Sequence, residues 1–194
     1  MAQTRRMGVE GSKQRTVLMD AAEAILCDEG YIGISARNVA TRAGFTKQLL
    51  YYYFRTMDDL ILALVRRINE RRLERFENAL LSAEPLRALW ALNTDPSGAA
   101  LATELTAIAS HREEVRAEIV TSAQQFRALQ ARTVSKLVSK SGQKASDSAA
   151  AIVMIAAALA KTVVSEAALG LTEGHAEALT VVERMLTQFS VLDG

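Results

Sequence analysis

The stretch Gly33–Met57, GISARNVATRAGFTKQLLYYYFRTM, contains four basic residues and no Asp or Glu. A short segment with helical periodicity follows Ser35, Gly44 interrupts it, and a second short segment begins at Thr46. Hydroxyl residues favour helix N-caps and glycine favours turns, so this order predicts a helix-turn-helix. The second helix of such a unit can enter the major groove of DNA with its N-terminal side chains at the base edges.

Three consecutive tyrosines, Tyr51, Tyr52 and Tyr53, end the second of these helices. Neighbouring side chains on an α-helix point about 100° apart, so the three rings cannot all face one small core. We expect at least one ring to be exposed, where its hydroxyl can reach a phosphate or a base. The alternative is a tyrosine-rich core segment whose basic neighbours are incidental.

Composition limits the architecture of the whole 194-residue chain. Apolar residues make up 49%, aromatic residues make up 5%, and there are only two prolines. This mixture favours helices and disfavours a β-sandwich or a disordered chain. The net charge is only +1, so attraction to a polyanion must come from a local cluster such as the acid-free stretch.

Apolar residues recur with helical periodicity along nearly the whole chain, which predicts an all-α fold of about nine helices. Thr56 and Asp59 have the spacing of a capping box, and so do Ser110 and Glu113. We expect a loop over Asn93–Gly98. The helices are expected at about residues 17–29, 35–43, 46–53, 56–81, 85–92, 99–110, 111–140, 146–170 and 173–192.

The single cysteine, Cys27, excludes an internal disulfide and a cysteine-rich zinc site. We expect a small core residue there, with a reactive thiol as the alternative. No apolar run behind the N-terminus could serve as a signal peptide. The longest uninterrupted apolar run, Ala149–Ala160, is too short to span a bilayer as a helix. We therefore expect a soluble, cytoplasmic protein without a membrane partner.

The stretch from Arg15 to Leu60 resembles the DNA-binding domain of the tetracycline-repressor (TetR) family. The length and the helix count extend the resemblance to the rest of the chain. It implies a DNA-binding domain over residues 1–57 and an effector-binding and dimerisation domain over residues 58–194. The residues that carry it are Ala21-Ala22, Glu29-Gly30-Tyr31, Val39-Ala40, Ala43-Gly44, Thr46-Lys47, Leu50-Tyr51-Tyr52-Tyr53-Phe54 and Asp59-Leu60.

The resemblance also implies DNA contacts for particular residues. Hydroxyls, lysine and helix N-termini suit phosphate oxygens, whereas Gln48 takes the position that faces base edges, where glutamine can pair with adenine. The sequence departs from the family at Met57, where lysine is common, and at Tyr53, where histidine is common. A basic arm with Arg5 and Arg6 either follows the minor groove or is a disordered tail. The implied contact residues are Ser35, Arg37, Thr46, Lys47, Gln48, Tyr51, Tyr52 and Tyr53.

The C-terminal part contains a helix without a polar face, because Ala149–Ala160 is apolar on every side. Such a helix must be covered on more than one side, either within one monomer or by a partner subunit. With the apolar stripe of the last helix, the second option gives a four-helix homodimer interface. A two-fold dimer suits a pseudo-palindromic operator. The predicted interface residues are Ile152, Ile155, Leu159, Val163, Val182, Met185 and Phe189.

In this family the helices between about Leu60 and Leu137 would enclose a small-molecule effector. Few aromatic residues and many Ala, Leu and Val favour an apolar or acyl-like molecule. The sequence indicates no cofactor and no metal site. The candidate pocket residues, each of which can instead be an ordinary core or surface residue, are Trp90, Glu104, His111, Phe126 and Arg127.

Enzyme functions find little support in the sequence. His111 and Glu114 have helical spacing but no matching metal ligands, and no phosphate loop or Gly-x-Ser-x-Gly motif occurs. A helical interaction module without DNA binding is the other alternative, and it leaves the acid-free basic stretch unexplained. We therefore predict a homodimeric, ligand-responsive transcriptional regulator with no catalytic residue. We expect a repressor that releases its operator on effector binding, with activation as the alternative.

Overall fold

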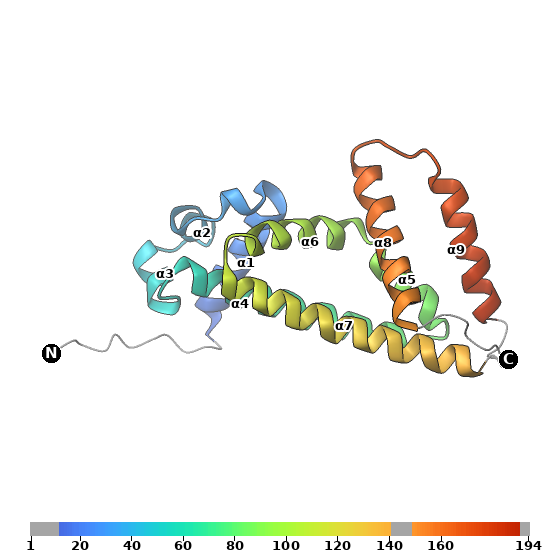
Figure 1. The fold of residues 1–194 in the computed structure, drawn as a ribbon. Coiled ribbons are helices and arrows are strands. Elements are labelled where there is room, and N and C mark those ends of the chain that lie inside the picture. The colour runs from blue at the N-terminus through green and yellow to red at the C-terminus, as the bar shows by residue number, and fades with distance from the viewer. Residues whose placement is uncertain (1–11, 141–148, 191–194) are drawn as a thin grey trace. The chain divides into compact units, whose positions relative to one another are not determined.

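The computed structural model describes residues 12–140 and 149–190, and within these ranges every regular element is helical (Figure 1). Over this described part of the chain, nine α-helices and one 3-10 turn confirm the predicted all-α fold. The elements are α1 (Lys13–Glu29), η1 (Tyr31–Gly33), α2 (Ala36–Arg42), α3 (Lys47–Tyr53), α4 (Met57–Leu80), α5 (Pro85–Asn93), α6 (Pro96–Ala109), α7 (Glu113–Lys140), α8 (Ala149–Ala168) and α9 (His175–Ser190).

Hydroxyl side chains begin α2, α3 and α4 where the sequence predicts them. The side-chain oxygens of Ser35 and Thr46 each accept a hydrogen bond from the backbone N–H three residues on. Thr56 and Asp59 form a reciprocal capping box, in which each backbone N–H donates to the other's side chain at 3.0 Å. These bonds satisfy backbone donors that have no partner inside the helix, and so they fix where each helix starts.

The sixth helix begins earlier than predicted. Pro96, Ser97 and Gly98 belong to α6 and Asn93 belongs to α5, so the expected loop over Asn93–Gly98 is wrong except at Thr94 and Asp95. Proline is tolerated in the first turn of a helix because it needs no N–H partner there. The Asp95 carboxylate also accepts the backbone N–H of Ser97 at 3.2 Å. Asn, Asp, Pro and Gly are typical of loops, but in this segment Asp95 and Pro96 mark the start of a helix.

Two other local expectations are wrong. Ser110 does not cap α7: its hydroxyl donates to the carbonyl of Ala107 at 2.7 Å, at the end of α6, and α7 begins at Glu113. Cys27 is exposed rather than part of the core, because it falls just off the buried stripe of α1. The predicted start of the eighth helix near Ser146, the end of the ninth near Leu192, and the Arg5-Arg6 arm lie outside the described residues.

The chain divides into two compact units. The first unit comprises the described residues up to Glu70 together with Leu101–Ile119. The second comprises Arg71–Ala100 and the described residues from Val120 onward. Helices α4, α6 and α7 therefore each contribute residues to both units.

One continuous apolar core fills the first unit. It takes buried side chains from α1, α2, α3, α4, α6 and α7, including Leu18, Val39, Leu50, Leu64 and Ile108. Each of these five is at most 1% exposed. Burial of a leucine or isoleucine side chain contributes about 1.5–3 kcal/mol, so this cluster is the main source of stability for the unit.

Ion pairs connect α4 to the helices on either side of it in the first unit. The Arg67 guanidinium donates to Asp20 at 2.6 Å and to Glu23 at 2.7 Å, both on α1. Arg112, just ahead of α7, donates to Asp58 in the first turn of α4 at 2.6 Å. The Arg112 pair ties the start of α4 to the segment ahead of α7, and the Arg67 pairs tie a point further along α4 to α1.

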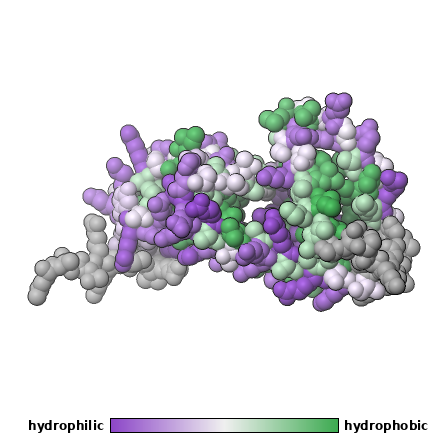
Figure 2. Space-filling view, in the orientation of Figure 1, coloured by the Kyte–Doolittle hydropathy of each residue, from purple (hydrophilic) through white to green (hydrophobic). Residues whose placement is uncertain are grey.

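The second unit buries much less apolar surface. Phe76, Leu89 and Phe126 form one small cluster, and Val134 and Val153 form another. Helix α8 continues to Ala168 and is long and apolar enough to cross a membrane by length and composition, contrary to the expectation from its apolar run. Only 11% of its most apolar window is buried. Hydrophobic residues accordingly gather at the surface over α8 and α9 (Figure 2).

Candidate nucleic-acid interface

A tight turn at Gly44 joins α2 to α3. Gly44 has a φ of +71°, which non-glycine residues rarely adopt, and a Cβ at this position would meet no atom within 4 Å. The glycine is therefore required for its backbone conformation and not for space. Beyond the turn, the Phe45 N–H donates to the carbonyl of Ala40 at 2.8 Å. Leu50 and Phe54 are buried in the first unit's core and anchor the C-terminal half of α3.

The N-terminal half of α3 presents polar side chains to solvent. Tyr53 is half-buried against the core, whereas the other two tyrosines are 40% and 43% exposed. The expectation that at least one tyrosine ring is exposed is confirmed. The arrangement gives one helix a buried C-terminal anchor and an exposed N-terminal end, as a helix that enters a groove requires. The exposed residues are Thr46, Lys47 and Gln48 at the N-terminal end of α3, and Tyr51 and Tyr52 in its C-terminal half.

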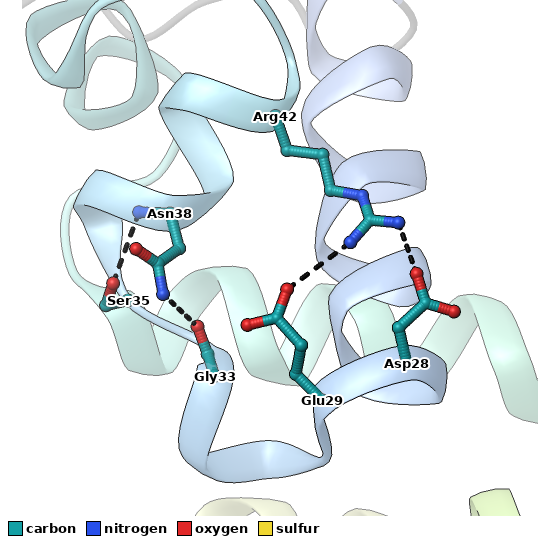
Figure 3. Close-up of polar contacts among 6 residues, drawn as sticks. All are labelled: Asp28, Glu29, Gly33, Ser35, Asn38 and Arg42. Atoms are coloured by element: carbon teal, nitrogen blue, oxygen red, sulfur yellow. Dashed lines mark hydrogen bonds and ion pairs between the residues drawn. The ribbon is translucent and has the colours of Figure 1, made fainter.

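The start of α2 lies on a short network of hydrogen bonds (Figure 3). The Asn38 backbone N–H donates to the Ser35 hydroxyl oxygen at 3.2 Å, and the Asn38 side-chain amide donates to the Gly33 carbonyl at 2.9 Å. The Ser35 O–H remains a donor while its oxygen accepts this bond. Arg37, in the first turn of α2, is exposed.

Arg42 adds less positive charge to this surface than the sequence suggests. Its guanidinium pairs with Asp28 and, at 3.4 Å, with Glu29, both at the C-terminal end of α1 (Figure 3). The stretch Gly33–Met57 is free of acids in sequence, but the fold places two carboxylates beside one of its four cations. Arg37, Lys47 and Arg55 are exposed and carry the positive charge of the stretch.

The five candidate effector residues are divided between the two units. Glu104 and His111 lie in the first unit, whereas Trp90, Phe126 and Arg127 lie in the second. His111 and Arg127 are exposed and Trp90 is half-buried. Glu104 is occupied by a hydrogen bond to a backbone N–H of the first unit.

Phe126 belongs to the small aromatic cluster of the second unit. Its ring centroid lies 5.2 Å from that of Phe76, and the Arg72 guanidinium lies 4.8 Å from its centroid. Burial against these rings, with a smaller contribution from the neighbouring Arg75 cation, lowers the pKa of Arg72. Leu92 packs against the same cluster and also lines a hollow outside it.

This hollow is an open cavity of about 730 Å³ within the second unit. Its walls are mainly aliphatic, and an ion pair between Arg75 and Asp95, at 3.0 Å, lies at its edge. Sequence reasoning missed it, because its residues come from three different helices and carry no common pattern. The lining residues are Arg75, Asn78, Ala79, Ala88, Ala91, Leu92, Thr94, Asp95 and Pro96.

The residues predicted for the dimer interface vary in exposure. Ile155 and Met185 are 69% and 57% exposed, and the side chain of Phe189 lies outside the described residues. Met154, which the sequence did not single out, is 61% exposed beside Ile155. A helix apolar on every side gives no periodic signal for its outer face, so sequence could not identify Met154. The half-buried members are Ile152, Leu159, Val163 and Val182.

An all-helical chain with this α2–turn–α3 unit is a helix-turn-helix protein. Residues 18–64 match the family described as bacterial regulatory proteins, tetR family. Over 70 residues the chain is 29% identical to the HTH-type transcriptional regulator PksA of Bacillus subtilis (strain 168), a match that covers 36% of this chain and 34% of PksA. Residues 18–64 therefore carry the DNA-binding domain of the tetR family of transcriptional regulators, and the chain spans about a third of the length of PksA in this match.

Solved structures share the fold well beyond the matched segment. GusR of Salmonella enterica superposes with a TM-score of 0.71 at 19% identity, over 96% of this chain and 98% of GusR. A protein from Saccharomonospora viridis, solved in complex with choline, superposes with a TM-score of 0.72 at 18% identity, over 80% of this chain and 85% of that one. These similarities show that the fold of the chain, α4–α9 included, is shared with these structures.

Proposed function

We propose that the protein binds operator DNA through α3 and represses transcription until a small molecule releases it. The observation that carries the proposal is the exposed polar end of α3, held by a buried end in the first unit's core. The match of residues 18–64 to the tetR family supports operator binding in general. We assign DNA binding to residues 1–57, and effector binding and dimerisation to residues 58–194.

In this proposal α3 enters the major groove and reads it through Gln48. The amide of a glutamine can pair with adenine through two hydrogen bonds. Lys47 and the helix N-termini of α2 and α3 hold phosphates on either side of the groove, which fixes the register of the protein on DNA. The other proposed DNA contacts are Ser35, Arg37, Thr46, Tyr51, Tyr52 and the half-buried Tyr53.

A second copy of the chain covers α8 and α9. Large exposed apolar surfaces on proteins mark interaction sites, and Met154, Ile155 and Met185 are all more than half exposed. Lys161 and Glu166 interrupt the apolar surface of α8, which suits a protein partner in the cytoplasm better than lipid. A two-fold dimer would present two α3 helices to a pseudo-palindromic operator, with half-sites one helical turn or a multiple of it apart.

The effector site lies in the second unit. The open hollow beside α4, α5 and the start of α6 has mainly aliphatic walls, which suits a small molecule with apolar character. Trp90, Phe126 and Arg127 remain candidate contacts in this unit, whereas the other two candidates, Glu104 and His111, belong to the first unit and are not assigned to this site. The effector must bind the DNA-free state more tightly than the DNA-bound state, by about 1–3 kcal/mol in typical cases.

Footprinting on DNA upstream of the protein's own gene, followed by a screen for molecules that release the footprint, tests this function. We expect a protected pseudo-palindrome, and transcription from it should rise when the protein is removed. Gln48→Ala should cost roughly 1–3 kcal/mol on the preferred operator and relax the preference at one base position. No protection on any upstream DNA would contradict operator binding, and a fall in transcription on removal would indicate an activator.

A further inference from the structure

A side chain of α6 reaches the turn between α1 and α2. The Glu104 carboxylate accepts a hydrogen bond from the backbone N–H of Tyr31, with 2.7 Å between N and Oε2, across 73 residues of sequence. Tyr31 is the first residue of η1, so its N–H has no partner within the turn itself. A carboxylate that accepts a backbone N–H at a helix start makes a charge-assisted bond, which is stronger than a neutral one.

The residue before Tyr31 leaves room for this carboxylate. Gly30 has a φ of +71°, and a Cβ there would lie 3.1 Å from one Glu104 oxygen and 3.3 Å from the other. Glycine is therefore needed for the backbone conformation, and a side chain here would also press on the Glu104 carboxylate. On either side of Glu104, Leu101 and Leu105 pack into the first unit's core, so α6 holds the carboxylate at this position.

The same turn is bonded at its other end to the start of α2. Gly33, the last residue of η1, accepts the Asn38 side-chain amide at 2.9 Å, and Asn38 also donates its backbone N–H to the Ser35 cap. Glu104 thus fixes the beginning of η1, and Asn38 ties its end to α2. The proposed contacts Ser35 and Arg37 lie on the segment so held.

We propose that Glu104 is a positioning residue for DNA recognition: it holds the α1–α2 turn, and through it the N-terminal end of α2, in the geometry that meets phosphate. The inference rests on the proposed DNA binding. Glu104 itself touches no DNA in this account. Its loss should therefore weaken binding without removing a phosphate contact, so the salt dependence of binding should not change.

The test compares three variants with the wild type, all well below their unfolding temperatures. Glu104→Leu keeps the apolar packing and removes the acceptor, whereas Glu104→Gln keeps an acceptor oxygen. Glu118→Ala is the matched control, because it removes a carboxylate that pairs with Arg66 of α4 at 3.0 Å, far along the sequence from the turn. The measurements are hydrogen exchange at the Tyr31 amide and the dissociation constant for the footprinted DNA at several salt concentrations.

For Glu104→Leu we expect faster exchange at Tyr31 and DNA binding weakened roughly three- to tenfold, with an unchanged salt slope. Glu104→Gln should bring binding back to within about twofold of the wild type, because a neutral acceptor still bonds the Tyr31 N–H, though more weakly than the carboxylate does. Glu118→Ala should bind as the wild type does. If Glu104→Leu does not fold, Glu104→Ala, which is smaller beside Gly30, is measured in its place with the same expectations.

Two results would overturn the proposal. Wild-type affinity in Glu104→Leu, with faster exchange at Tyr31, would make Glu104 a contributor to stability alone. Unchanged exchange at Tyr31 would show that the bond does not hold the turn. Neither of these two results contradicts the proposed DNA binding. If the wild-type protein binds no upstream DNA, the proposed function and the role of Glu104 are both wrong.

Discussion

The two compact units of the chain bury apolar side chains in different ways. In the first unit, six helices contribute to a single cluster whose members are almost fully buried. In the second, the buried residues divide into separate small clusters around Phe126 and Val153, while Met154, Ile155 and Met185 remain exposed. The first unit therefore covers its apolar side chains within its own core, whereas the second unit leaves large apolar side chains exposed to solvent.

This difference indicates where each unit obtains its stability and its function. A complete core holds α3 rigidly, which is what recognition of a fixed DNA surface requires. The second unit has exposed apolar helices and an open hollow, so a partner subunit or a ligand that covers them can stabilise it. A molecule that binds only the folded state of a protein stabilises that state.

Truncation of a buried leucine should destabilise the first unit strongly. Leu64 is 1% exposed in its core, so Leu64→Ala should lower the free energy of unfolding by about 2–5 kcal/mol. Ile155→Ala, in the second unit and at protein concentrations low enough for monomer, should change it by less than about 0.5 kcal/mol. Denaturant unfolding of both variants makes the comparison. Equal losses would contradict the contrast between the units.

A charge on the exposed face of α8 should separate the two subunits. Ile155→Lys would bury an unpaired ammonium group in the proposed interface, and we expect the dimer dissociation constant to rise roughly tenfold to a hundredfold. Sedimentation or mass measurement in solution at micromolar concentration gives the readout. Lys161→Ala, on the same helix, is the control and should stay dimeric. If the wild-type protein is a monomer at this concentration, the proposed dimer is wrong.

The contact between α5 and α9 should have the smallest effect and should depend on pH. Arg87 donates to Glu183 at 2.6 Å, and this hydrogen bond is the main reason that the pKa of Glu183 is lowered. A lowered folded-state pKa stabilises the fold above the unfolded pKa, and this contribution disappears as pH falls through the folded value. Both groups lie at the surface, so salt also weakens the pair.

Arg87→Ala should therefore lower the melting temperature slightly at neutral pH. The difference from the wild type should shrink in acid and at high salt. Thermal melts over a pH series at two salt concentrations measure it. A difference that grows as the pH falls would contradict this assignment of the Glu183 pKa.

Features that depend on neighbouring residues could be predicted from the sequence. The caps at Ser35 and Thr46 and the capping box at Thr56 and Asp59 involve residues three apart, so their spacing alone indicates them. The helix-turn-helix follows from the same local signals with Gly44 between them. The order and number of helices in the described ranges follow from periodicity.

Features that depend on packing between distant segments could not be predicted. The partners of Arg42 lie on α1, so an acid-free stretch in sequence is not acid-free in space. The bond from Tyr31 to Glu104 spans 73 residues, and no local pattern signals it. The exposure of Cys27 depends on the rotation of α1 against its neighbours, which a stripe of apolar residues defines only to within about one position.

We propose that α3 holds DNA phosphates through its exposed N-terminal end. The most direct test is the salt dependence of DNA affinity for the wild type and for Lys47→Ala, with Lys136→Ala in the second unit as a control. The account predicts that Lys47→Ala weakens binding to every DNA sequence and reduces the slope of log K against log salt by about one, whereas the control changes neither. An unchanged affinity and slope in Lys47→Ala would contradict it.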